Sequence, residues 1–84
     1  MTRVAKLYAK ALRQPNSLAF DDLIALVRAT GFVLRRQRGD HMVFTHPQLG
    51  QQGFLNLQSR GGKAMPYQVR QVLEKIDEFG LLEV

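Results

Sequence analysis

The sequence predicts an α+β fold, in which a small three-stranded antiparallel sheet has helices packed on one face, in the order α-α-β-β-β-α. Two observations carry this prediction. Apolar residues recur at helical spacing in residues 3–13, 20–30 and 66–79, but between residues 32 and 58 they alternate as in strands. The strand-like segments follow one another through short links, which favours an antiparallel meander.

The first two elements are predicted helices. Residues 3–13 form an amphipathic helix that Pro15 ends. We expect its apolar stripe to extend the core, because large side chains are costly to leave exposed on so small a domain; the stripe comprises Val4, Leu7, Tyr8, Ala11 and Leu12. The second helix covers residues 20–30, with Asp21 and Asp22 in its first turn, where carboxylates suit the helix dipole.

The central segment predicts three strands, at residues 32–38, 41–46 and 54–58. Gly39-Asp40 is a hairpin signal between the first two strands, and a glycine in the first place suits a type II′ turn. Residues 47–53 predict a loop, and residues 59–63 predict a flexible basic loop. Pro66 then opens the last helix.

Alternation along the second strand separates the two histidines. Met42 and Phe44 are bulky and apolar, so we expect them on the face covered by helices, with His41 on the open face. His46 has the parity of Met42 and Phe44 but lies at the strand end. This prediction holds unless a bulge shifts the register. In the third strand Leu55 and Leu57 pack in the core, and the residues that turn outward are Phe54, Asn56 and Gln58.

Length and composition limit the function classes. A chain of 84 residues has room for one domain, which we place at residues 1–84. The absence of cysteine excludes disulfides and thiolate metal sites. Residues 1–15 have charges spread throughout, unlike a signal peptide, and no stretch is apolar enough to span a bilayer. We therefore expect a cytoplasmic protein with no membrane partner.

The chain has a net charge of +5, and its positive side chains are concentrated in two segments. Residues 2–13 carry four positive charges and no negative one. The middle of the chain has a single acid, Asp40, against six basic residues: Arg35, Arg36, Arg38, Arg60, Lys63 and Arg70. Such a basic block predicts a polyanionic partner, a nucleic acid first of all; the alternative is a solvated face that aids solubility.

His41 is the strongest candidate for a catalytic residue. An imidazole exchanges protons near neutral pH, and three arginines precede it within six positions, across the Gly39-Asp40 turn. Arginines hold a phosphodiester and stabilise the charge that builds on it. Such a set suffices for metal-free RNA cleavage, in which the RNA 2′-hydroxyl attacks the adjacent phosphorus. The alternative is an ordinary surface histidine.

A second candidate site lies at residues 59–67. Gly61-Gly62-Lys63 leads into the predicted start of the last helix, where free N–H groups and the helix dipole favour anions. The alternative is a flexible turn with incidental charge.

Three segments together resemble the HicA family of toxins. Residues 31–47 read GFVLRRQRGDHMVFTHP, which is similar to the basic strand and Gly-Ser-His turn of that family. Residues 61–82 read GGKAMPYQVRQVLEKIDEFGLL, similar to its lysine-containing loop and last helix. Residues 15–32, PNSLAFDDLIALVRATGF, resemble the first helix of a longer subgroup. The resemblance makes residues 15–82 the family core and residues 1–14 an added helix.

The resemblance implies a fold like that of double-stranded-RNA-binding domains and a toxin that cleaves mRNA independently of the ribosome. It places the catalytic histidine of the family at His41, and it implies neither a cofactor nor a metal. The implied partners are mRNA and a HicB-type antitoxin that masks the active face. Direct DNA binding is not expected outside the antitoxin complex, because no helix has a dense basic face with base-reading residues.

Two departures from the family pattern leave alternatives open. The usual serine before the histidine is Asp40, which could hold the imidazole or repel the substrate phosphate. The third strand lacks the further histidines of the longer subgroup, so Arg36, Arg38 or water would share the proton transfers. A non-catalytic RNA-binding module and a degenerate toxin that only binds an antitoxin are therefore the competing hypotheses.

Overall fold

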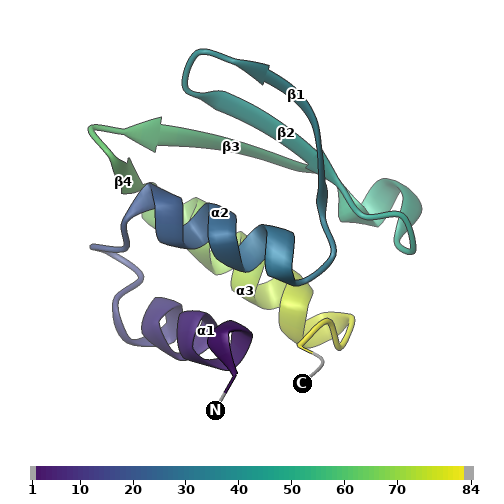
Figure 1. Ribbon diagram of the computed structural model, residues 1–84, viewed down its shortest axis with the longest axis horizontal. Helices are drawn as coiled ribbons and strands as arrows, with labels where there is room; N and C mark the ends of the chain where they lie inside the picture. Colours follow the sequence, from purple (N-terminus) through teal and green to yellow (C-terminus); the bar gives the residue numbers. More distant parts are fainter. Residues whose placement is uncertain (1, 83–84) are drawn as a thin grey trace.

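The computed structural model describes residues 2–82, in which three α-helices pack against an antiparallel sheet (Figure 1). The elements are α1 (Arg3–Arg13), α2 (Phe20–Ala29), β1 (Val33–Arg38), β2 (His41–Thr45), the 3-10 turn η1 (Gly50–Gly53), β3 (Leu55–Arg60), β4 (Lys63–Ala64) and α3 (Pro66–Glu78). The predicted α+β class is confirmed, but the sheet has four strands in the order β1-β2-β3-β4, not three. No helix within the described range is long and apolar enough to cross a bilayer.

The elements lie in three layers, which are the sheet, the pair α2 and α3, and α1 (Figure 1). The core between the sheet and the helix pair is formed by side chains without exposed surface, among them Leu23, Val27, Phe44, Leu57 and Val69. Full burial of one such side chain contributes about 1.5–3 kcal/mol. The opposite face of the sheet is covered by no helix among residues 2–82, and we call it the open face.

The segment expected as a flexible loop at residues 59–63 is a tight hairpin instead. β3 continues to Arg60, and Gly61 and Gly62 form a two-residue turn into β4. Their φ angles of 59° and 81° match a type I′ turn, which needs two residues with positive φ. A hydrogen bond of 2.9 Å from Ala64 N–H to the Leu18 carbonyl ties β4 to the segment before α2, and a second one from Phe20 N–H to the Gly62 carbonyl ties the turn to the start of α2.

Replacing Gly62 by alanine is expected to lower the free energy of unfolding by about 1–2 kcal/mol, because the new side chain must adopt a left-handed backbone conformation. A Cβ there meets no atom within 4 Å, so the effect is conformational only. Thermal unfolding should show a melting temperature lower by about 4–8 °C per kcal/mol. Gly62→Asn is the matched control, since asparagine tolerates this conformation; equal melting of Gly62→Ala and wild type would contradict the turn assignment.

The first helix packs on α2 and α3 on the side away from the sheet (Figure 1). Ala11 is buried, and Val4, Leu7 and Tyr8 are partly buried against the core, as the apolar stripe predicts. The prediction is wrong for Leu12, which is 54% exposed. Leu12 lies about 100° around the helix from Ala11 and so points past the contact with the other helices.

Gln68 in α3 closes the outer edge of β3. β3 pairs with β4 only at Ser59 and Arg60, which leaves the preceding backbone groups without a neighbouring strand. The buried carboxamide of Gln68 donates to the Asn56 carbonyl at 3.0 Å and accepts the Gln58 N–H at 3.0 Å. The side chain therefore makes the two hydrogen bonds that a peptide group of another strand would make.

Candidate active site

His41 begins β2 on the open face, as alternation predicts. Met42 and Phe44 are buried against the helices, whereas His41 is exposed. The turn before it has two residues, since Arg38 pairs with His41. In that turn only Gly39 has a positive φ, of 57°, which fits the predicted type II′ turn.

A β-bulge in β1 determines where its arginines point. Leu34 pairs with Phe44, but the next pair is Arg36 with Val43, so Arg35 is an extra residue. Strict alternation from the core-facing Leu34 would have turned Arg36 toward the helices. The extra residue turns Arg36, and two residues later Arg38, onto the open face beside His41.

Five residues line a shallow depression of about 280 Å³ on the open face: Arg36, Arg38, His41, Val43 and Asn56. Strand pairing explains the set, because His41 lies opposite Arg38, while Val43 lies between Arg36 and Asn56. Within residues 2–82 the one ion pair joins Lys10 to Asp22. The guanidinium groups of Arg36 and Arg38 therefore keep their donors for an anion. Guanidinium groups bind phosphate oxygens in a bidentate manner, and the imidazole beside them can move a proton.

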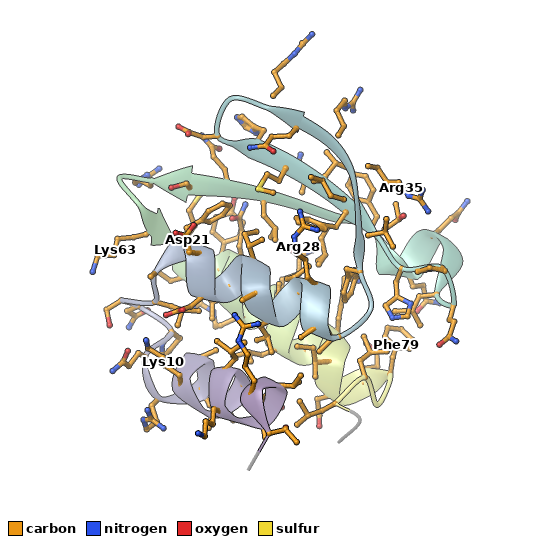
Figure 2. All side chains as sticks on the ribbon, viewed as in Figure 1. Lys10, Asp21, Arg28, Arg35, Lys63 and Phe79 are labelled. Atoms are coloured by element: carbon orange, nitrogen blue, oxygen red, sulfur yellow. The ribbon has the colours of Figure 1, made fainter. Side chains whose placement is uncertain are left out.

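The remaining predicted basic residues divide between two locations. Arg60 and Lys63 pair across the second hairpin next to the buried Ala64, so both side chains start from the open face. Figure 2 shows Lys63 at the end of the molecule formed by this hairpin. Arg70 lies on the exposed side of α3, which packs on the other face, and the structure does not bring it to the depression.

Asp40 does not border the depression. Its side chain lines a different hollow, on the helix side of the sheet, together with Phe20, Ile24 and Gln37. Its backbone carbonyl accepts the Ser59 N–H at 3.3 Å. The structure therefore gives Asp40 no contact through which to hold the imidazole of His41, and places its charge away from the arginines that line the depression.

His46 is a buried part of the core. It is 6% exposed, its Nε2 lies 3.0 Å from the Thr30 carbonyl oxygen, and its Nδ1 accepts the Gln48 N–H at 3.2 Å. Because Nδ1 accepts, we assign the ring proton to Nε2, which donates to Thr30. The ring packs edge-on against Phe32 at 5.0 Å. Both ring nitrogens are thus engaged in holding loops together.

Val43 and Asn56 line the depression but are not among the residues predicted to form the site. Alternation predicts that Asn56 points outward, and only the β2–β3 register places it beside Val43. Among residues 2–82 no three histidine, cysteine, aspartate or glutamate side chains cluster as a metal site. The polar lining thus consists mainly of groups that donate hydrogen bonds, a set suited to a phosphodiester.

Comparison with protein families identifies the family of this chain. A family model described as the HicA toxin of bacterial toxin–antitoxin systems matches residues 20–77, which is more than half of the chain. The matched range contains every residue that lines the depression and leaves α1 outside. Neither the comparison with curated proteins nor the comparison with solved structures gave a match. The family match over most of the chain establishes that this protein belongs to the HicA family of toxins from bacterial toxin–antitoxin systems.

Proposed function

We propose that the chain is an endoribonuclease that cleaves mRNA in the cytoplasm by metal-independent acid–base catalysis, and that a HicB-type antitoxin neutralises it by covering the open face. The observation that carries this proposal is the meeting of His41 with Arg36 and Arg38 in one depression. Membership of a toxin family supports it. Residues 15–82 would form the catalytic unit, with the preceding helix as an addition.

The chemistry follows from the groups that line the depression. Arg36 and Arg38 hold the non-bridging oxygens of an RNA phosphate. His41 takes the proton of the 2′-hydroxyl as that oxygen attacks the phosphorus, and the bond to the 5′-oxygen breaks. Among residues 2–82, no group besides His41 that exchanges protons near neutral pH lines the depression, so water supplies the proton of the leaving oxygen. The products are a 2′,3′-cyclic phosphate and a 5′-hydroxyl.

The RNA path extends beyond the depression. Arg60 and Lys63 continue the basic surface past the second hairpin, and Arg35 continues it toward the other end of the sheet. The family resemblance implies a fold like that of double-stranded-RNA-binding domains. In this proposal the RNA follows the open face of the sheet. Arg70 is not part of this path, because α3 packs against the opposite face.

The direct test is incubation of the purified chain with labelled RNA in the presence of a chelator. We expect fragments with 2′,3′-cyclic phosphate ends, and we expect induced expression to arrest growth with loss of intact mRNA. The missing second titrating group favours one other function, a non-catalytic RNA-binding protein. RNA that is bound by the folded chain but stays intact, with normal growth, would establish that second function instead.

Removing both charges from the depression, by Arg36→Gln with Arg38→Gln, is expected to lower kcat/KM for RNA cleavage by about 10²–10³-fold, the usual loss when a charge-stabilising donor is removed. The matched control is Lys6→Gln with Arg13→Gln, which removes the same charge from α1, the layer farthest from the sheet (Figure 1). The control should keep most of its activity. Equal losses in both variants would mean that net charge, not the depression, determines the rate.

A further inference from the structure

We propose that Phe54 is a stacking platform for an unpaired base, so that the substrate is a single RNA strand lying along the open face. The inference rests on the proposed ribonuclease function and adds to it the class of RNA and a residue that positions it. Phe54 is 51% exposed, although it immediately precedes Leu55, which is fully buried. Alternation therefore places the phenyl ring on the open face.

The backbone that carries Phe54 is anchored by the turn before it and by the pairing of Leu55 with Phe44 after it. Phe54 follows η1 as its C-terminal cap, with its N–H directed to the Gln51 carbonyl. The same turn is held to α3 by Lys75, whose ammonium donates to the Gln52 carbonyl at 2.6 Å. A half-exposed aromatic ring forgoes part of its burial energy. Held by this backbone, the exposed ring is presented to a ligand instead of being folded into the core.

A guanidinium group is held at the same end of β2 and β3 as this ring. The β2–β3 register ends with Phe44 opposite Leu55, and Thr45 and Phe54 are the next residues beyond this pair. Arg35, the bulged residue of β1, donates its Nε–H to the Thr45 hydroxyl at 2.9 Å. In Figure 2 Arg35 lies on the opposite side of β1 from Arg28, which lies 5.8 Å from the core-facing Phe44 ring. An aromatic face for a base and a guanidinium for a phosphate are thus presented together.

The distance between Phe54 and His41 determines which nucleotide Phe54 contacts. His41 pairs with Gln58, four residues along β3 from Phe54, which is about 13 Å of strand. Neighbouring phosphates in one RNA strand lie closer together than this. The stacked base therefore belongs to a nucleotide other than the one that is cut, and Phe54 acts as a positioning residue.

The kind of RNA follows from the chemistry of stacking. In a duplex both faces of every base are covered by neighbouring base pairs, and such RNA is recognised by its shape and backbone. A protein ring can stack only on a base that is free. The face between Phe54 and His41 contains Val43 and Asn56, so a single strand can follow it without interruption.

The first test uses fluorescence. The sequence contains no tryptophan, so Phe54→Trp in the His41→Ala protein introduces a single indole at the proposed platform. Single-stranded oligoadenylate should quench its emission, and a duplex of equal length should not. The matched control is Leu12→Trp, at a 54% exposed position on α1, and it should not respond. Anisotropy of a dye on the RNA measures binding independently, and binding without quenching would overturn the proposal.

The second test uses activity. Phe54→Ala should raise KM for single-stranded RNA by roughly 5- to 100-fold with little change in kcat, as expected for loss of one base stack, and Phe54→Tyr should restore it. If Phe54→Ala cleaves RNA with unchanged KM, the platform is rejected and the ribonuclease is kept. The exposed ring of Phe54 would then be left for contact with a protein partner. Quenching by RNA that wild type does not cleave would keep the platform and reject the ribonuclease. Absence of any RNA binding would reject both.

Discussion

Replacement of His41 by alanine is expected to lower kcat for RNA cleavage by about 10²–10⁴-fold, the range that one acid–base group contributes. RNA affinity should change little, because Arg36 and Arg38 remain in the depression. His41 is exposed and joins its neighbours through the backbone pairs of β2, so its side chain can be removed without opening the core. The loss should therefore be one of chemistry and not of folding.

The measurement is single-turnover cleavage of labelled RNA, paired with growth after induced expression of each protein. Thermal unfolding of the variant serves as the control for folding, and we expect the melting temperature of wild type. A variant that cleaves at the wild-type rate would show that the imidazole does not transfer the proton. If wild type and variant both leave RNA intact while folded, the RNA-binding function or a toxin reduced to antitoxin binding replaces the ribonuclease.

Replacement of His46 by alanine should lower the free energy of unfolding by about 2–4 kcal/mol, since it leaves a cavity and two backbone groups without partners. The total free energy of unfolding of a chain of 84 residues is about 4–12 kcal/mol, so the expected loss is a large share of it. His46 is closely enclosed, with Gly31 against its ring and Gly53 against its Cβ and backbone nitrogen. A Cβ on either glycine would lie 2.7 Å from a His46 atom.

Urea unfolding of two variants separates the contributions at this position. His46→Phe keeps most of the ring volume and loses the hydrogen bonds to Thr30 and Gln48. Its free energy of unfolding should therefore fall by about 1–3 kcal/mol, less than that of His46→Ala. His41→Ala is the matched control for a histidine outside the core. Wild-type stability in His46→Ala together with lost cleavage would assign His46 to the chemistry and contradict the structure-based role.

The face on which His41 lies could be predicted from sequence because Met42 and Phe44 mark the buried side of β2 unambiguously. The orientation of the arginines in β1 could not. After Leu34 that strand has no apolar residue to show which side is buried, so nothing in the sequence reveals the bulge at Arg35. The one extra residue decides whether Arg36 and Arg38 meet the imidazole.

The fourth strand cannot be predicted from sequence, for a different reason. Lys63 and Ala64 are too few to show a period, and besides pairing with β3 they are held by the distant segment before α2. Leu12 shows a similar limit, since helical spacing indicates a stripe but not how wide a contact the neighbouring helices offer. The helices and the first hairpin depend on local patterns, and their predicted bounds lie within one residue of those observed.

The carboxamide of Gln68 has a consequence for copies of the chain at high concentration. An open sheet edge is a template on which another molecule can add a strand and start a fibre. At β3 the carboxamide already occupies the backbone groups that such a strand would need. At β1 the bulge and three like charges oppose the approach of a second copy. Overproduction of the protein should therefore leave it dispersed instead of driving sheet-to-sheet polymerisation.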